Sequence, residues 1–204
     1  MKKYEKSYKQ ELKDNFLSSL PVLYIFDLDG CIADSDDFVL TNKQAYKIDK
    51  DKIHIPTDEN KNDFSIWYMK KHMMDIPPYM GILSLFVKLS MFSNVAIVTS
   101  RFEELKPDTI NWLKKVIIDN FNEDIWRRCK FQIIFNENQE TSLKFKSRII
   151  DNLKEFYKIL LMVEDHPEVI AYAQKQGIEV LVPSTGYKNL NGKDLKKRKA
   201  NVRK

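Results

Sequence analysis

The sequence predicts an α/β fold built around a doubly wound, mostly parallel β-sheet. Short apolar runs alternate along the chain with segments of about ten to fifteen residues that have helical periodicity, which is the pattern of parallel strands joined by helices. The 204 residues include only five glycines, which argues against a large all-β fold with many tight turns. The length suits one domain with a sizeable core, and the chain has no internal repeat.

Five strands are expected from short, mostly apolar runs, of the kind that is buried on both faces of a parallel sheet. Each run is too short for an independent helix, so a strand is the better interpretation. The expected strands lie at residues 22–26, 94–99, 131–135, 159–163 and 178–182.

Helices are expected between these strands, where apolar residues recur at helical spacing. Pro107 suits a first helical turn, and Gly177 suits the end of a helix. The expected helices lie at residues 41–48, 63–74, 79–91, 107–119, 143–157 and 166–176, with a polar loop at 51–62.

The N-terminal segment, residues 1–20, is expected to form an amphipathic helix that docks on the main domain. Its apolar residues recur every four positions and so fall on one helical face. These residues are Tyr4, Tyr8, Leu12, Phe16 and Leu20.

The main domain is expected over residues 21–187, with a small insertion, a flap or cap, at about 36–78. Residues 188–204 form a basic tail with eight Lys or Arg and one Asp, a net charge of +7, so residues 1–187 sum to −2 within the total of +5. Such a tail can contact phosphate backbones. The alternative is a solvated tail that only aids solubility.

Composition points to a cytoplasmic protein. The two cysteines, Cys31 and Cys129, cannot form a disulfide framework, which favours a reducing compartment. The basic N-terminus lacks the apolar stretch of a secretory signal. No apolar run approaches the roughly 20 residues of a membrane span.

Polar and charged residues follow the first two strands directly. Asp27 and Asp29 come after the strand at 22–26, and Thr99, Ser100 and Arg101 come at the end of the second strand. Burying unpaired carboxylates is costly, so a cation or a reacting substrate is expected to compensate them. Ligands of open α/β sheets bind beyond the carboxyl ends of the strands, which is where these residues are expected.

Two more carboxylates, Glu164 and Asp165, follow the strand at 159–163, and Lys146 begins a helix near the same edge of the sheet. Carboxylate oxygens select a hard cation, so Mg²⁺ is the expected metal. A site with Mg²⁺ and a lysine could bind a phosphate dianion as its ligand. Lys144 competes for this role, but Lys146 is preferred because Phe145 and Ile149 fall on the buried side of the helix.

A phosphate ester in such a site would meet suitable reactive groups. An aspartate in line with phosphorus is a competent nucleophile that forms an aspartyl-phosphate. A second carboxylate two residues further on can protonate the leaving oxygen and later activate water.

Four ordered motifs resemble those of the haloacid dehalogenase superfamily of phosphohydrolases: Asp27-Leu28-Asp29-Gly30, then Thr99, then Lys146, then Glu164-Asp165. The resemblance covers most of residues 22–182. It implies that Asp27 is the nucleophile and Asp29 the general acid/base.

The same resemblance assigns the other residues of the site. Thr99, with Ser100 beside it, and Lys146 would bind the transferring phosphoryl group. Asp165 and Glu164 would hold Mg²⁺ together with Asp27 and the backbone carbonyl of Asp29.

Two positions depart from the family pattern. Cys31 stands where the family often has Thr, and Glu164 stands where it often has Asp. Glutamate is one methylene longer than aspartate, which leaves open a contact with the metal only through water.

Local similarities suggest a nucleotide or a 3′-phosphorylated nucleic-acid end as the substrate. Residues 108–113 resemble the 3′-phosphatase domains of polynucleotide kinases, and residues 164–170 are similar to their acidic motif; nucleotidases show related similarity. No kinase phosphate loop, GxxxxGK[ST], occurs in the chain. Arg101 and Trp67 are candidate substrate contacts, although an aromatic residue in an apolar helix more often belongs to the core.

Two alternatives stay open. The insertion at 36–78 could fold as a compact cap, which would make the protein a phosphatase of small metabolites. The chain could also be a catalytically idle fold that binds nucleic acid through residues 188–204. A fold of this type does not name its own substrate.

Overall fold

The computed structural model describes residues 19–35 and 61–183. Most of the helix predicted at 1–20, the helix predicted at 41–48 and the basic tail at 188–204 lie outside these residues.

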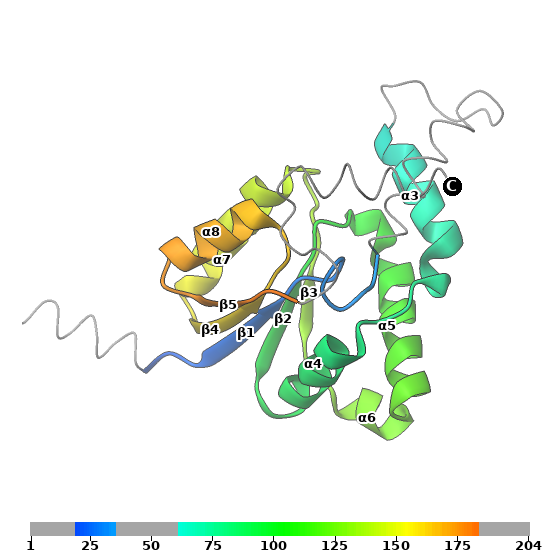
Figure 1. The fold of residues 1–204 in the computed structure, drawn as a ribbon, viewed down its shortest axis with the longest axis horizontal. Helices are drawn as coiled ribbons and strands as arrows, with labels where there is room; N and C mark the ends of the chain where they lie inside the picture. Colours follow the sequence, from blue (N-terminus) through cyan, green and yellow to red (C-terminus); the bar gives the residue numbers. More distant parts are fainter. Residues whose placement is uncertain (1–18, 36–60, 184–204) are drawn as a thin grey trace, which may run out of the picture.

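The described residues form one five-stranded sheet in which all paired strands are parallel. This sheet, with helices on both faces, confirms the predicted α/β class (Figure 1). The strand order is β3-β2-β1-β4-β5. The strands are β1 (Val22–Phe26), β2 (Asn94–Val98), β3 (Gln132–Ile134), β4 (Lys158–Val163) and β5 (Glu179–Leu181).

The described helices lie close to the predicted positions, with ends that differ by a few residues. The helix predicted at 63–74 is divided into an α-helix and a short 3₁₀ turn, η2. The helical elements are α3 (Lys61–His72), η2 (Met73–Asp75), α4 (Met80–Phe92), η3 (Glu103–Leu105), α5 (Lys106–Asn120), α6 (Glu123–Arg128), α7 (Ser142–Lys154) and α8 (Pro167–Lys175).

The short helix α6 was not predicted. Its six residues are too few to show helical periodicity in the sequence. The side chain of Asn122 caps this helix by accepting a hydrogen bond from the backbone N–H of Ile125 at 2.9 Å. An asparagine at this position is a common N-cap, and it was the available sequence signal.

Two apolar cores pack against the sheet, one with α4 and α5 and the other with α7 and α8. These two pairs of helices cover opposite faces of the sheet (Figure 1). Alternation along β1 divides its side chains between them. Phe26 packs in the core with α4 and α5, where its ring meets that of Phe86 edge-on at 5.4 Å between centroids. Leu23 and Ile25 belong to the core with α7 and α8, as does the buried Phe145.

The strand order puts the topological switch point of the sheet between β1 and β4, where folds of this type have a crevice. The chain runs outward from β1 through β2 to β3, then returns to the other side of β1 to form β4 and β5. At such a switch point the connections after neighbouring strands diverge to opposite faces, and ligands bind in the gap beyond the carboxyl ends. The loops after β1 and β4 are therefore where a site is expected.

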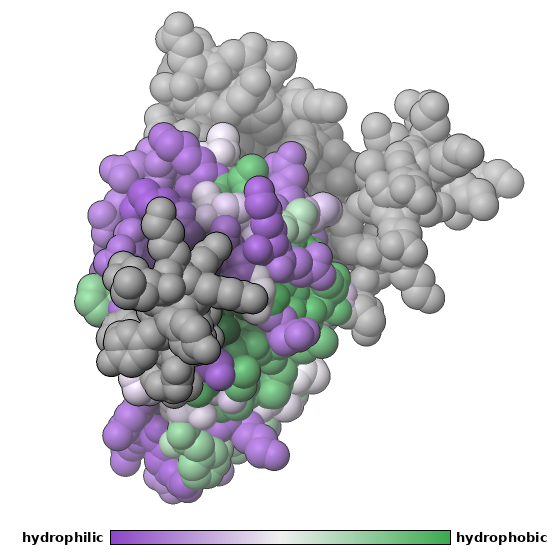
Figure 2. All heavy atoms as spheres, turned by 90° about the vertical axis from the view of Figure 1, so that its left-hand side faces the viewer, coloured by the Kyte–Doolittle hydropathy of each residue, from purple (hydrophilic) through white to green (hydrophobic). Residues whose placement is uncertain are grey.

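The opposite end of the sheet differs in character. Figure 2 shows a hydrophobic area on the side of the molecule where β1 begins. Because the crevice lies at the other ends of the strands, this area is not part of it.

Among the described residues, no helix has the length and apolar character that crossing a membrane requires.

Candidate active site

Asp27 is buried at the carboxyl end of β1, where its carboxylate meets a buried lysine. Lys146 comes from α7 and places its Nζ 2.8 Å from Asp27 Oδ2. The side chain of Lys146 is only 1% exposed, and that of Asp27 is 7% exposed. An ion pair removed from water in this way must be held by close geometry, because desolvation is costly for both partners.

Glu164 holds the same lysine from the other side. Its Oε2 lies 2.8 Å from Lys146 Nζ, and its Oε1 accepts a hydrogen bond from the backbone N–H of His166 at 2.9 Å. The side chain of Glu164 is fully buried. Both of its oxygens are therefore engaged by the protein, and in this arrangement the residue anchors Lys146.

Asp27, Glu164 and Lys146 bring two negative charges and one positive charge together in a buried place. Burial and these charges both shift the pKa values of the three groups. Burial raises the pKa of Asp27 to about 7, with help from the negative charge of Glu164 and against the attraction of Lys146. Burial also raises the pKa of Glu164. Burial opposes the charge on Lys146, but the two carboxylates outweigh it and raise the pKa of the lysine. When both carboxylates are ionised, the cluster carries one surplus negative charge that a cation could compensate.

Asp29 lies in a different environment two residues further on. Arg101, which follows β2, binds its carboxylate through two hydrogen bonds, Nε to Oδ2 at 2.8 Å and Nη2 to Oδ1 at 2.7 Å. Burial works against ionisation here, but the guanidinium holds the pKa of Asp29 below its usual value. The side chain of Asp29 is 29% exposed, so it is accessible to solvent, unlike that of Asp27.

Arg101 is itself fixed by residues from two other elements. Its Nη1 donates to Thr109 Oγ1 at 3.1 Å and approaches Met73 Sδ at 3.4 Å, and its guanidinium lies 5.9 Å from the ring centroid of Trp112. Sequence reasoning did not identify Thr109 or Met73 as part of the site. The resemblance at residues 108–113, which include Thr109 and Trp112, was a signal that could have done so.

Thr99 and Ser100 reach the same edge of the sheet after β2. Thr99 is fully buried, and its Oγ1 accepts a hydrogen bond from the backbone N–H of Arg101 at 3.2 Å. Ser100 donates to Ser142 Oγ at 2.8 Å, at the first turn of α7. The structure thus connects the end of β2 with the helix that carries Lys146.

The other candidates lie further out. Lys144 is 74% exposed and pairs with Glu140 at 3.1 Å, so Lys146 is the lysine that contacts Asp27. Trp67 is 41% exposed on α3 and is not a core residue. His166 precedes α8, and its Nδ1 is buried without a hydrogen-bond partner among the described residues.

A group of possible metal ligands lies beside the lysine. One ligand atom each from Asp27, Cys31 and Asp165 lie within 4.8 Å of one another. Two carboxylates at this spacing suit a hard cation such as Mg²⁺, whereas a thiol is a poor ligand for it. Burial and the nearby carboxylates raise the pKa of Cys31 well above its usual value, which keeps the thiol protonated.

Gly30 leaves room for this group. It has a φ of +77°, which favours glycine, and a Cβ at this position would overlap the carboxylate of Asp165. The glycine after Asp29 therefore allows the β1 loop and the β4 loop to approach closely.

No protein-family model and no curated protein sequence matches this chain. Solved structures do resemble it. A chain of the Pnkp1/Rnl/Hen1 complex superposes with a TM-score of 0.55 at 11% identity, over 81% of this chain and 46% of that one. This chain thus spans less than half of the neighbour's length.

Two other neighbours are of similar size to this chain. A haloacid dehalogenase-like hydrolase from Streptococcus pneumoniae has a TM-score of 0.50 at 12% identity, covering 81% of this chain and 85% of the other. A Lactobacillus plantarum protein named as a candidate phosphoglycolate phosphatase has a TM-score of 0.51 at 18% identity, covering 79% and 84%. At such identities the similarity shows a shared fold, which is the haloacid dehalogenase-like fold that the sequence motifs predicted.

Replacing Gly30 tests the close approach of the two loops. Both Gly30 and Gly177 have a positive φ, but a Cβ at Gly177 would meet no atom within 4 Å. Gly177→Ala should lower the free energy of unfolding by about 1 kcal/mol. Gly30→Ala should cost clearly more because Asp165 must also move. Urea unfolding compares the two, and equal losses would contradict the close packing.

Removing Glu164 tests its role as an anchor of Lys146. Glu164→Ala should lower the free energy of unfolding by about 3 kcal/mol, because Lys146 loses one buried partner, the backbone N–H of His166 loses its acceptor, and a cavity is left. Asp119→Asn is the control: it breaks an exposed pair with Lys115 at 2.8 Å and should cost at most about 0.5 kcal/mol. Similar losses in urea unfolding would show that the buried network contributes little.

Proposed function

We propose that this protein is a phosphomonoesterase in which Asp27 attacks the phosphorus atom of its substrate. The observation that carries this proposal is the buried Asp27 at a strand end, 2.8 Å from Lys146 and close to Asp165. The positive charge of Lys146, which partly compensates Asp27, could also attract an incoming phosphate. The shared fold supports the proposal but does not prove an activity.

In the first step, a carboxylate oxygen of Asp27 forms a bond to phosphorus while the bond from phosphorus to the ester oxygen breaks. The leaving oxygen takes a proton, for which Asp29 is the proposed donor. Arg101 binds both oxygens of Asp29 in the structure, so at least one of these two bonds must open for the carboxyl group to deliver a proton.

In the second step, water attacks the phosphorus of the aspartyl-phosphate and releases inorganic phosphate. Asp29, again a carboxylate, accepts the proton of this water, and Asp27 is restored. The contact with Arg101 favours this ionised form of Asp29 and holds its position.

Phosphate binding is assigned to Lys146, Thr99 and Ser100. Lys146 is held in place by two carboxylates. Its ammonium group could therefore attract the phosphoryl oxygens without having to reorganise. Thr99 and Ser100 supply hydroxyl groups at the same edge. The hydrogen bond between Ser100 and Ser142 would have to rearrange for Ser100 to donate to a phosphate.

Asp27 and Asp165 are the residues that would hold Mg²⁺, with the backbone carbonyl of Asp29 as a further ligand. Mg²⁺ would offset the negative charge of the phosphate group. Glu164 is a weaker candidate for direct contact, because its two oxygens are taken by Lys146 and His166.

The proposed substrate is a nucleotide or a 3′-phosphorylated nucleic-acid end. The resemblance of residues 108–113 to polynucleotide 3′-phosphatases gains weight because Thr109 fixes Arg101, which holds Asp29. The structural similarity to a chain of an RNA repair complex also supports it. A phosphatase of small metabolites is the second candidate, supported by the neighbour named for phosphoglycolate.

Asp27→Asn tests the nucleophile. The variant should lose phosphate release from p-nitrophenyl phosphate by at least about 1,000-fold, because an amide cannot form the acyl-phosphate, while its circular dichroism stays that of the wild type. Asp34→Asn, in the same loop but outside the proposed machinery, should keep its activity. Turnover of Asp27→Asn near the wild-type rate would disprove the assignment.

Chelation tests the metal. EDTA should stop phosphate release, and added Mg²⁺ should restore it, because the surplus negative charge beside Asp27 would otherwise repel the phosphate. Phosphate release that is unchanged by EDTA would mean that the cluster of Asp27 and Asp165 has another role.

Arg101→Lys tests the orientation of Asp29. A lysine cannot make the two-pronged contact, so kcat should fall by about a hundredfold while KM for p-nitrophenyl phosphate changes little. Arg148→Lys, at an exposed contact with Glu140, is the matched control and should leave kcat unchanged. Equal kcat values for the two variants would contradict a positioning role for Arg101.

A further inference from the structure

The outer surface of α3 carries an exposed aromatic ring next to lysine side chains. Trp67 is 41% exposed, and Lys71 Nζ lies 5.2 Å from its ring centroid. Lys70 is also exposed on this helix. We name Trp67, Lys70 and Lys71 the α3 surface. The exposed part of the indole, next to two lysines, offers an aromatic surface and positive charge at one place, a combination that suits an anionic ligand with flat rings.

A direct structural link joins this surface to the candidate active site. The chain passes from α3 into η2, whose Met73 contacts Arg101 Nη1 at 3.4 Å, and Arg101 binds Asp29. The helix α3 also packs against η3, the turn that begins two residues after Arg101. Trp67 lies six residues before Met73, which is about 9 Å along a helix axis.

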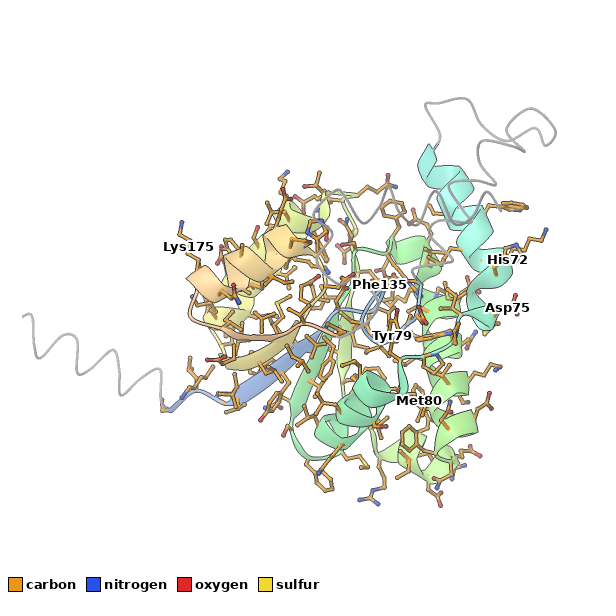
Figure 3. All side chains as sticks on the ribbon, in the orientation of Figure 1. His72, Asp75, Tyr79, Met80, Phe135 and Lys175 are labelled. Atoms are coloured by element: carbon orange, nitrogen blue, oxygen red, sulfur yellow. The ribbon has the colours of Figure 1, made fainter. Side chains whose placement is uncertain are left out.

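The figures agree with this placement. Figure 1 shows α3 beside the start of α5, which follows η3. In Figure 3, His72 and Asp75 mark the end of α3 and η2 on the outer side of the molecule. His72 Nδ1 and Asp75 lie 3.8 Å apart, so Asp75, the acidic residue of η2, is directed to His72.

We propose that the α3 surface binds the single-stranded nucleic-acid segment whose terminal phosphate is processed at Asp27. This inference rests on the proposed function. A base would stack on Trp67, and Lys70 and Lys71 would contact backbone phosphates. Every base offers a π-face, so the surface would bind strands with little sequence preference.

The position of the surface favours a strand over a small molecule. A ligand whose phosphate lies at Asp27 and that also contacts Trp67 must span from the carboxyl end of β1 to the exposed side of α3. A metabolite of a few carbon atoms is too short for this, whereas a chain of nucleotides repeats an aromatic base and an anionic phosphate along its length. The pairing of an aromatic ring with two lysines matches that repeat.

A binding experiment tests the surface without relying on catalysis. The probe is a fluorescently labelled, non-phosphorylated single strand of about ten nucleotides, followed by anisotropy with the full chain. Trp67→Ala should weaken binding about tenfold, and Trp67→Phe, which keeps a stacking ring, should weaken it less. Lys70→Ala with Lys71→Ala should reduce the slope of log K against log salt by about 1.4.

The control is a matched pair at the opposite end of the sheet. Phe156 is 64% exposed, and the exposed Lys158 lies two residues further on, where β4 begins. Phe156→Ala and Lys158→Ala should leave oligonucleotide binding unchanged. Wild-type binding by the Trp67→Ala variant, or an equal loss in Phe156→Ala, would overturn the inference.

Kinetics separate this inference from the proposed function. Trp67→Ala should raise KM for a 3′-phosphorylated oligonucleotide about tenfold and leave turnover of p-nitrophenyl phosphate unchanged. A wild-type protein that releases no phosphate from either substrate would contradict the proposed function, while the anisotropy result would still decide the α3 surface. Equal losses on both substrates would overturn the surface.

Discussion

The candidate site depends on one buried cation, Lys146, held between two buried carboxylates. The sheet register makes this possible: Phe26 of β1 is paired with Val163 of β4, so Asp27 and Glu164 follow at neighbouring positions. Taking three charged groups out of water is costly, and each contact at 2.8 Å compensates only part of that cost. A structural purpose alone would be served as well by apolar side chains, so the cluster is better explained by its chemistry.

Asp27 and Asp29 show how one loop gives two identical side chains different properties. Asp27 is enclosed beside Lys146 and Glu164, and burial raises its pKa to about 7. Asp29 is partly exposed and gripped by Arg101, which lowers its pKa. Environments that shift the pKa values of two carboxylates in opposite directions are typical of sites where the two groups have separate tasks. The residue between them, Leu28, is buried in the core on the α4 and α5 face of the sheet.

The sequence was sufficient to predict the strands of the sheet and the set of residues that meet at its edge, because both follow from local patterns. Apolar runs determine the strands, and parallel strands bring their carboxyl ends to one edge. The partners of each side chain depend on tertiary packing, which no local pattern encodes. Thus the contact of Glu164 with Lys146, the grip of Arg101 on Asp29 and the exposure of Trp67 required the structure.

The contact between Met73 and Arg101 connects η2 with the surroundings of Asp29, because Arg101 also binds Asp29. The helix before η2, α3, carries Trp67 and Lys71 on its exposed side. A strand held on α3 would therefore press on the same element that supports the acid/base residue. The thioether contact is weak and adaptable, so it would tolerate a shift of Arg101 during the proposed proton transfer from Asp29. If both proposals hold, substrate recognition on α3 and proton transfer by Asp29 are connected through Arg101.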